Sequence, residues 1–335
     1  LGAALPSWNG RTAALPPTDQ ISLGFVGVGD HGTHVNLNTF LGRNDIRVVA
    51  LCDVDREHLD RAKGLVETRY AEDRKSGSYR GVFTTGDWRE VVGREDVDAV
   101  VVSTPDHWHV LPAVAAMRAG KDVMCEKPLS LTVHEGRVLS DTARRYGRIF
   151  QTASENRSKL NFLRACETVR NGRIGTLRRI VVGLPRGIGT AGNYTDFTPV
   201  PVPPTFDYNM WLGPAPEAAY HPARCHWNFR WIRDYSGGNL TDWGAHMLDI
   251  AQWGNNSEYS GPISVEGRAT YARHPLYDTP TDWDLVYEYA NGVTLICRSD
   301  SPSIRFEGTA GWVAVPSWGG AMQASTPDIA AEPIS

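Results

Sequence analysis

The strongest constraint on this chain is a glycine-rich turn that joins its first apolar strand to a helix. Residues 23–28 are apolar and lead into Gly27-Val28-Gly29-Asp30-His31-Gly32, a GxGxxG turn after which a helical pattern begins. In such a turn the first glycine permits the sharp change of direction. The second lets the backbone approach a pyrophosphate, and the third lets the helix and the strand pack closely. By itself the pattern is equally compatible with a purely structural turn.

The residues after the turn favour a dinucleotide site. A second apolar strand, predicted over residues 46–52, ends directly before Asp53. Asp53 lies about 20 residues after the last glycine, where a ribose-binding carboxylate belongs. A carboxylate there accepts a hydrogen bond from the 2′-hydroxyl of NAD and repels the 2′-phosphate of NADP. Arg56 is close enough in sequence to weaken that repulsion, so NAD(H) is favoured and NADP(H) stays open.

Strand and helix patterns alternate through the first half of the chain, which predicts a doubly wound parallel sheet with right-handed crossovers. The further predicted strands are residues 97–103, 122–125 and 148–152. The predicted helices are residues 56–70, a short one from residue 87, 107–119 and 132–146, with a polar loop at 71–80.

Polar and aromatic side chains follow these strands directly. Thr104-Pro105-Asp106-His107-Trp108-His109 follows one strand, Glu126-Lys127-Pro128 the next, and Arg157 comes shortly after the last. Ligands of open α/β sheets bind outside the carboxyl ends of the strands. The glycines, Asp53, the His/Trp loop and Lys127 are therefore expected to meet at one edge of the sheet.

The second half has a different pattern. A helix over residues 159–171 and a strand over 177–184 precede a stretch rich in Pro, Gly and aromatic residues, 185–224, predicted to form a loop wall around a site. A helix over 241–254 then precedes strands that lack intervening helices, which predicts an antiparallel sheet. Those strands are expected at residues 263–271, 283–289, 293–298 and 311–315. The predicted domains are residues 21–152 and 153–335, after an extended lead, 1–20.

The helix predicted over residues 241–254 carries Asp242, His246 and Asp249 at i, i+4 and i+7, and so on one face. A carboxylate one turn before a histidine can fix the imidazole tautomer and raise its basicity, as a general base requires. Two other interpretations stay open. Asp242 could cap the helix while His246 is a satisfied core residue, or both could bind a metal with ligands from elsewhere. No metal site is predicted.

Lys127 follows a buried strand, and Pro128 biases it toward an extended conformation. A lysine here can point into the cleft and hydrogen-bond a substrate hydroxyl, with Glu126 holding it, although an ion pair at a strand end is the simpler interpretation. Tryptophans cluster in the second half, Trp231 among them, and flat aromatic faces suit sugar rings as well as protein cores.

Composition excludes several classes of function. The formal net charge is -4 with no basic stripe, which argues against nucleic acid. No apolar run approaches the roughly 18 residues that a membrane span requires. The 5 cysteines form no CxxC pair, so neither zinc nor a disulfide framework is indicated, and Cys52 and Cys125 are expected to be buried free thiols.

In order along the chain, GVGDHG, Asp53, TPDHWH, EKPL and GGNLTDWGAHMLDIAQW resemble the motifs of the Gfo/Idh/MocA oxidoreductase family, which includes glucose–fructose oxidoreductase and inositol dehydrogenases. TPDHWH and NFRWIRDYSGGNLTDWGAH look most like its exported bacterial branch. The resemblance implies an N-terminal Rossmann domain and a C-terminal α+β domain with an open, mainly antiparallel sheet. That sheet often forms an oligomer interface, so a homo-oligomer, dimer or tetramer, is expected.

The resemblance also implies roles. Lys127 would position the reacting hydroxyl, and His246 would take its proton with Asp242 behind it. Cofactor contacts are expected from Gly27, Gly29, Asp30, His31, Gly32, Asp53, Thr104, Pro105, His107, Trp108, His109, Glu126 and Lys127. Substrate contacts are expected from Arg157, Trp231, Asp242 and His246.

The chain is thus predicted to be an NAD(P)-dependent oxidoreductase acting on the CH–OH group of a sugar, glycoside or cyclitol. One alternative is a redox-neutral glycosidase or lyase with tightly bound NAD, which oxidises its substrate, lets elimination proceed and returns the hydride. The other is a non-catalytic, nucleotide-binding regulator on the same fold.

The lead is rich in Pro, Ala and Gly and suits a linker, an artificial chain end or the stub of a removed export signal. Its likeness to the segment after a twin-arginine signal makes a periplasmic or exported location the expectation, with the cytoplasm as the alternative. Members of this branch usually continue past the position of Ser335, so a shortened member or part of a longer chain is expected.

Overall fold

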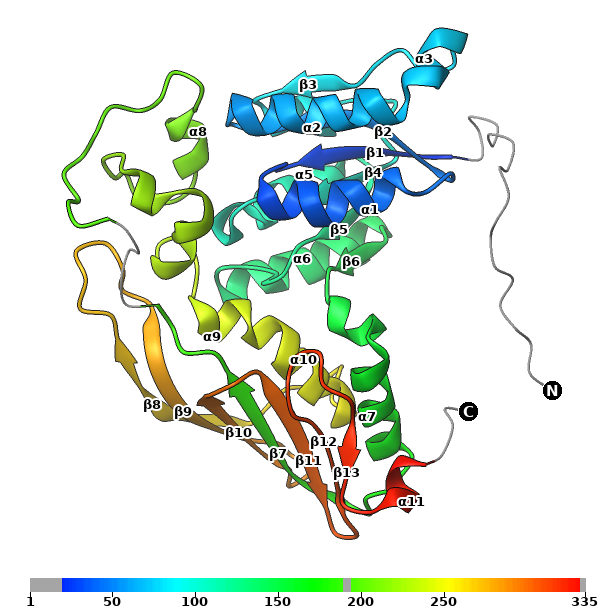
Figure 1. The fold of residues 1–335 in the computed structure, drawn as a ribbon, viewed down its shortest axis with the longest axis vertical. Helices are drawn as coiled ribbons and strands as arrows, with labels where there is room; N and C mark the ends of the chain where they lie inside the picture. The colour runs from blue at the N-terminus through cyan, green and yellow to red at the C-terminus, as the bar shows by residue number, and fades with distance from the viewer. Residues whose placement is uncertain (1–19, 189–193, 332–335) are drawn as a thin grey trace.

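The computed structural model describes residues 20–188 and 194–331, so nearly all of the predicted lead lies outside the described residues. Two sheets organise the chain, one for each predicted domain, and Figure 1 shows them at opposite ends of the molecule. The first has six strands in the order β3-β2-β1-β4-β5-β6, and the second has seven in the order β13-β12-β11-β7-β10-β9-β8.

The first sheet is parallel throughout, as the alternation of strands and helices predicts. Its strands are β1 (Ile21–Val26), β2 (Ile46–Cys52), β3 (Phe83–Thr85), β4 (Ala99–Val102), β5 (Asp122–Cys125) and β6 (Phe150–Thr152). Leu23 and Phe25 pack into one buried cluster and Val26 into another, so helices cover both faces of the sheet. Sheets covered on both faces need near-continuous apolar strands, and β1, β2 and β4 have them.

The helices of this domain are η2 (Gly32–Leu37), α1 (Asn38–Leu41), α2 (Arg56–Arg69), α3 (Ala71–Ser76), α4 (Trp88–Val92), η3 (Asp106–Trp108), α5 (Val110–Arg118) and α6 (Val133–Tyr146). Several begin where an acceptor side chain caps the first turn. Asp55 caps α2, and Thr132 with Glu135 forms a capping box at α6. The prediction of a polar loop at 71–80 is wrong for residues 71–76, because these form α3, which follows α2 almost without a break.

The second domain places helices against one face of a mixed sheet. Its strands are β7 (Leu177–Leu184), β8 (Ser264–Tyr271), β9 (Pro280–Glu288), β10 (Thr294–Ser299), β11 (Ser303–Gly308), β12 (Trp312–Val315) and β13 (Gln323–Ala324). The antiparallel prediction holds for every pair except β7 and β10, which are parallel. β11 and β13 are not in the prediction, because β11 carries Arg305 and Glu307 between its buried residues and β13 is two residues long.

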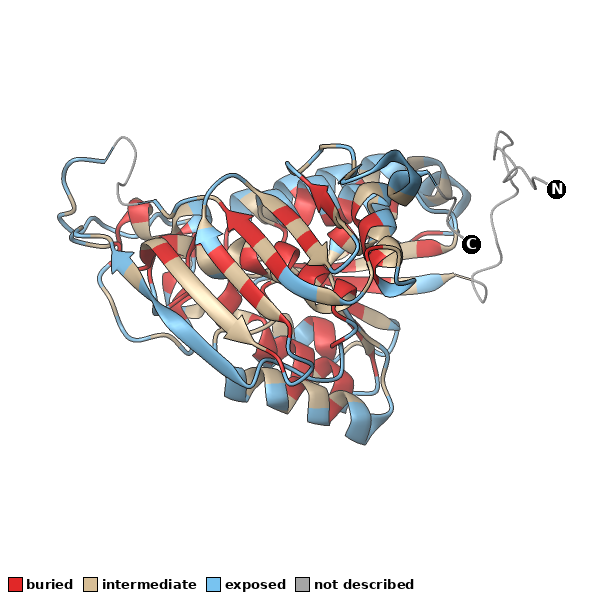
Figure 2. Cartoon of the chain, turned by 90° about the horizontal axis from the view of Figure 1, so that it is seen from below, coloured by how far each residue is buried: buried red, intermediate tan, exposed pale blue. Residues whose placement is uncertain are grey.

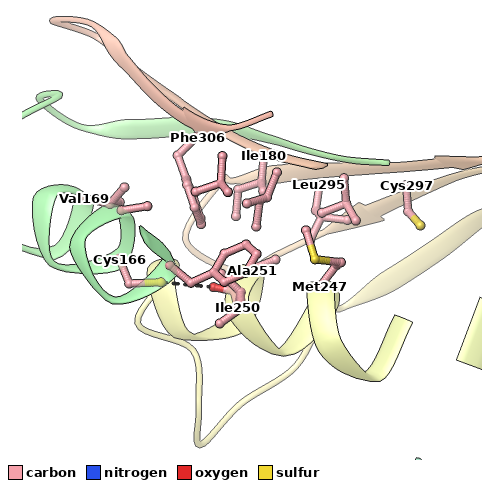
Figure 3. Close-up of a cluster of buried hydrophobic side chains, with 14 of the residues drawn as sticks. Cys166, Val169, Ile180, Met247, Ile250, Ala251, Leu295, Cys297 and Phe306 are labelled. Atoms are coloured by element: carbon pink, nitrogen blue, oxygen red, sulfur yellow. Dashed lines mark hydrogen bonds between the residues drawn. The ribbon is translucent and has the colours of Figure 1, made fainter. Parts of the chain in front are cut away.

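The core of the second domain lies between the sheet and two helices, α7 (Leu160–Arg170) and α10 (Gly244–Gly254). Figure 3 shows Cys166 of α7, Ile250 of α10 and Phe306 of β11 together in this layer, where the Cys166 thiol donates to the Ile250 carbonyl oxygen at 3.5 Å. In β10 and β11 buried residues alternate with intermediate ones, and β8 is exposed along nearly all of its length (Figure 2).

The remaining elements are η4 (Glu155–Ser158), α8 (Tyr208–Leu212), η5 (Pro222–Arg224), η6 (His226–Trp231), α9 (Asn239–Asp242) and α11 (Pro327–Ala330). The helix predicted over 241–254 is thus two helices, α9 and α10, which meet at Trp243. We call residues 194–236 the loop wall. It returns to the first domain, where the Arg56 amide donates to the Thr205 carbonyl oxygen and the Asp207 amide to that of Val54, both at 2.9 Å. Residues 189–193 lie outside the described residues.

No helix among the described residues is long and apolar enough to cross a bilayer. All 5 cysteines are free and buried, as predicted for Cys52 and Cys125.

The capping box of α6 gives a test of local stability. The Thr132 hydroxyl accepts from the Glu135 amide at 3.2 Å, and the Glu135 carboxylate accepts from the Thr132 amide at 2.9 Å. We expect Thr132→Ala to lower the free energy of unfolding by about 1 kcal/mol, measured in urea. The control is Thr68→Ala in the exposed last turn of α2, where alanine is the better helix former and no loss is expected. Equal losses in the two variants would contradict the capping role.

His107 gives a test in mild acid. Its imidazole is buried between the domains, with Nε2 donating to the Trp211 carbonyl oxygen at 3.1 Å. Burial lowers the pKa of His107 from 6.5 to about 4. Because the folded state disfavours the protonated form, this contribution to stability is complete above the unfolded pKa and is lost as the pH falls toward the folded one. We expect the urea stability of His107→Gln to fall less than that of the wild type between about pH 7 and pH 4.5.

The matched control for this measurement is His134→Gln, on the exposed surface of α6. Its stability should follow the wild-type dependence on pH. If His107→Gln loses as much stability in acid as His134→Gln does, buried His107 is not the group that titrates.

Candidate functional site: a strand-end pocket between the domains

A cavity of about 370 Å³ lies at the carboxyl ends of the strands of the first sheet, and we call it the strand-end pocket. It contains nearly every residue predicted to contact the cofactor. The predicted residues that line it are Gly27, Gly29, Asp30, His31, Gly32, Asp53, Thr104, Pro105, Trp108, Glu126, Lys127 and Asp242. The expectation that separate strand ends converge on one edge is therefore met by the geometry.

The glycine turn has the geometry that the sequence motif requires. Gly27 has a φ of +87°, and a Cβ there would lie 2.7 Å from the backbone carbonyl of Ser103. A Cβ on Gly32 would lie 2.5 Å from the Gly27 carbonyl oxygen. The close packing of the backbone therefore leaves no room for a side chain at the first or the third glycine. A Cβ on Gly29 would meet nothing closer than the His58 ring at 3.6 Å. Gly29 thus leaves its backbone open to the pocket, as approach of a pyrophosphate requires.

Asp53 joins the glycine turn to the start of α2. One carboxylate oxygen accepts from the Val28 amide at 2.8 Å, and the other accepts from the Asp55 amide at 2.9 Å. Each oxygen keeps further acceptor capacity on the side that lines the pocket. The position therefore fits a ribose hydroxyl donor, and the ribose contact of Asp53 stays a prediction.

Glu126 has a different role from the one predicted. Its Oε1 accepts from Asn36 at 2.8 Å and from His31 Nε2 at 3.0 Å. Among the described residues, its other oxygen accepts only from the backbone amide of Lys127, at 3.2 Å. Burial raises the pKa of Glu126, but the hydrogen bond and charge of His31 and the bond from Asn36 outweigh it and hold that pKa below the ordinary value. Glu126 therefore holds the helix after the glycine turn against β5 and does not hold the Lys127 ammonium.

The Lys127 ammonium instead contacts Asp242, across the boundary between the domains. Both side chains are largely buried, and Arg230 Nε lies 3.7 Å from the second oxygen of Asp242. Burial raises the pKa of Asp242, but the charges of Lys127 and Arg230 outweigh it and hold this pKa below its ordinary value. The carboxyl is therefore ionised at neutral pH. Two charged groups at this depth need each other, because leaving either unpaired is costly.

His246 lies one turn beyond Asp242 but faces a different environment. Its ring packs against Trp318 at 4.9 Å and Trp243 at 6.4 Å between centroids, and it is not part of the pocket lining. Burial first, then the charge of Lys127, lowers the pKa of His246 to about 4, so the imidazole is neutral at neutral pH. Nδ1 is buried without a hydrogen-bond partner among the described residues, and no hydrogen bond joins His246 to Asp242 there.

The alternative in which Asp242 caps the following helix is wrong, because Trp243 is the N-cap of α10 and no side chain caps it. The predicted fixing of the imidazole by Asp242 is not seen either. The three residues expected on one face therefore contact different partners: Asp242 pairs with Lys127, His246 packs against Trp318, and Asp249 pairs with Arg157.

Besides His246, four predicted contact residues lie outside the strand-end pocket. Arg157 donates to both oxygens of Asp249 at 2.7 Å and to Glu258 at 3.0 Å. It therefore forms ion pairs within the protein in place of the predicted substrate contact. Trp231 is 2% exposed within an aromatic cluster, so it packs instead of facing a substrate. The cofactor contacts predicted for His107 and His109 are corrected as well. Both are buried, and their ring nitrogens contact the backbone carbonyls of Trp211, Pro128 and Thr104.

The structure adds pocket residues that the sequence does not single out. The loop wall supplies Phe206, Met210, Trp211, His226, Trp227, Phe229 and Arg230. The Pro- and aromatic-rich composition indicates such a wall, but which side chains face inward depends on contacts between distant segments. Asp55 and His58 also line the pocket, and their place directly after Asp53 is a signal that sequence reasoning could have used.

Comparisons with known proteins agree with this arrangement. Residues 21–154 match the model described as "Oxidoreductase family, NAD-binding Rossmann fold" of GFO_IDH_MocA. Residues 175–316 match the model described as "Oxidoreductase family, C-terminal alpha/beta domain" of the same group.

Similar solved structures include GenD2 from gentamicin A biosynthesis in complex with NAD, with a TM-score of 0.68 at 19% identity over 95% of this chain and 76% of that one. The WlbA dehydrogenase from Bordetella pertussis, in complex with NADH and UDP-GlcNAcA, has a TM-score of 0.67 at 17% identity over 92% and 78%. An aldose-aldose oxidoreductase from Caulobacter crescentus has a TM-score of 0.65 at 21% identity over 94% and 85%. At these identities the likeness is one of fold.

Among curated proteins, a Glycosyl hydrolase family 109 protein of Shewanella pealeana is 34% identical over 143 residues, which are 43% of this chain and 30% of the relative. Glycosyl hydrolase family 109 protein 1 of Shewanella sp. (strain ANA-3) is 37% identical over 133 residues, 39% of this chain and 27% of the relative. The matched part thus spans less than a third of these relatives. The two family models together cover most of the chain, and the protein is therefore a member of the Gfo/Idh/MocA oxidoreductase family with an NAD-binding Rossmann domain.

Proposed function

We propose that this protein oxidises a hydroxyl-bearing carbon of a sugar, glycoside or cyclitol, with NAD as the hydride acceptor. The observation that carries the proposal is the Lys127–Asp242 ion pair at the edge of the strand-end pocket. It brings one residue from each domain to the place where a small polar substrate would meet a dinucleotide bound over the glycine turn. Sugar-related neighbours such as the aldose-aldose oxidoreductase support this substrate class.

The residues present fit the cofactor. The open backbone at Gly29 suits a pyrophosphate, Asp53 suits a ribose hydroxyl, and the pocket continues to Lys127. When bound, NAD supplies the hydride acceptor for the reaction.

Lys127 can hold a substrate hydroxyl in place. An ammonium group has three N–H donors, and Asp242 takes one of them, so others are free to bind a hydroxyl oxygen in the pocket. A positive charge at that oxygen favours loss of its proton as the carbon gives up hydride. Two groups could receive the proton: Asp242, which lines the pocket, and neutral His246 one turn away.

Replacement of Lys127 tests this role. We expect Lys127→Met to lower kcat by about 10²–10⁴-fold on the best substrate found in a panel of sugars, glycosides and cyclitols. The substitution removes the charge that orients and polarises the hydroxyl, while the glycine turn and Asp53 still bind NAD. Steady-state kinetics give kcat, and a thermal shift with NAD shows that the cofactor still binds.

Two further variants make this result specific. Lys127→Arg keeps a partner for buried Asp242 but changes the position of the donors, so it should fold normally and still be slow. Lys75→Met, on the exposed helix α3, should match the wild type. Unchanged turnover in Lys127→Met would remove Lys127 from the reaction, whereas unchanged biological activity of a Lys127 variant in the absence of any turnover would favour the regulator.

A second candidate function is redox-neutral cleavage of a glycosidic bond, and one specific observation favours it. The curated relatives that match at 34% and 37% identity are named as glycosyl hydrolases. Oxidation of the hydroxyl carbon two positions from the glycosidic carbon would acidify the C–H between them and permit elimination of the glycosidic oxygen. Water would then add to the double bond, and the hydride would return to the ketone. The same Lys127–Asp242 pair would serve the oxidation step.

Product and cofactor measured in one reaction separate the two candidates. With a panel of glycosides and excess NAD, a dehydrogenase accumulates NADH in step with product, whereas the redox-neutral enzyme releases sugar while NADH stays constant. We expect NADH to accumulate at a 1:1 ratio to oxidised product. Release of free sugar without NADH would replace the dehydrogenase with the glycosidase.

A further inference from the structure

Three side chains that bind metals well meet where the strand-end pocket reaches α2 and the loop wall. Asp55 Oδ2 lies 4.0 Å from His58 Nε2 and 3.8 Å from His226 Nε2. Among the described residues, these three supply one ligand atom each within 4.8 Å of one another. All three line the strand-end pocket, but the function proposed above assigns them no role.

The local backbone explains how the first domain supplies two of the three groups. Asp55 caps α2 through Oδ1, which accepts from the Glu57 amide at 2.9 Å, and this leaves Oδ2 free on the pocket side. His58 follows three residues later and therefore lies on the same side of the first turn.

The third group comes from the second domain in an uncommon backbone conformation. His226 has a φ of +52°, in the left-handed region that non-glycine residues seldom adopt and that functional sites often contain. Its ring lies 5.1 Å from His58 and 5.5 Å from Phe206, between centroids. His226 is thus held over the cluster at some conformational cost, although its side chain is 41% exposed.

A second layer completes the arrangement. His58 Nδ1 lies 3.8 Å from Asp53 Oδ1, and a carboxylate behind one imidazole nitrogen leaves the other as the ligand atom.

We propose that Asp55, His58 and His226 bind a divalent transition-metal ion of the Zn²⁺ type, with an open coordination position toward the strand-end pocket. Zn²⁺ takes nitrogen and oxygen ligands at about 2.0–2.2 Å in tetrahedral sites, which sets the ligand atoms roughly 3.4 Å apart. The three ligand atoms lie within 4.8 Å of one another, so they need to close by up to about 1.4 Å, and exposed His226 has room to move. The ion would join α2 of the first domain to the loop wall of the second.

Metal content of the purified protein tests this directly. Tag-free protein is stripped with EDTA, dialysed against micromolar Zn²⁺ without dinucleotide, and its zinc measured. We expect one Zn²⁺ per chain, and Co²⁺ in its place should give the visible absorption of a tetrahedral site. In His226→Ala and Asp55→Asn the affinity for Zn²⁺ should fall about tenfold or more. Asparagine caps helices as well as aspartate does, so Asp55→Asn keeps α2 intact.

His134→Ala, on exposed α6, is the matched control and should bind Zn²⁺ as the wild type does. The proposal is overturned if the wild type holds no zinc, or if His226→Ala holds it with unchanged affinity. Because the titration contains no dinucleotide and measures no turnover, its failure would leave the oxidoreductase proposal untouched, and a failed activity assay would leave the metal site untouched.

Discussion

The ion pair between Lys127 and Asp242 is the interaction on which the rest of the site depends. Each partner comes from a different domain, and each is largely buried. Charges at that depth are stable only when they are paired, so the pair fixes how the strand end after β5 meets α9. The loop wall and the glycine turn line the same pocket as this ion pair.

The glycine turn is fixed from two directions. Asp53 binds the Val28 amide from the end of β2, and Glu126 binds His31 and Asn36 from the end of β5. The ends of β1, β2 and β5 at one edge of the sheet are thereby linked through two carboxylates. The turn is preformed for this reason, and a bound dinucleotide would need little rearrangement of the backbone.

Sequence reasoning predicts the first domain well, because its signals are local. The glycine turn, the apolar strands before Asp53 and Lys127, and the helix that begins near Thr132 each depend on neighbours in the sequence, and the structure has them where expected. The misses depend on distant contacts. Arg157 and Trp231 have the chemistry of ligand-binding residues, but Asp249 and the aromatic cluster around Tyr235 occupy them. A spacing of i, i+4 places His246 beside Asp242, yet only the fold decides that Trp318 covers it.

The short pairing between residues 54–56 and 205–207 has a consequence for ligand exchange. It lies where the strand that ends at Asp53 meets the loop wall, so the pocket is enclosed by both domains and not by the first alone. A dinucleotide inside would touch both, and binding would stabilise the closed arrangement by the same free energy with which closure strengthens binding. Release of a ligand and separation of the domains then become one equilibrium, and the rate at which the wall lifts from the first domain sets an upper limit on how often the ligand can be exchanged.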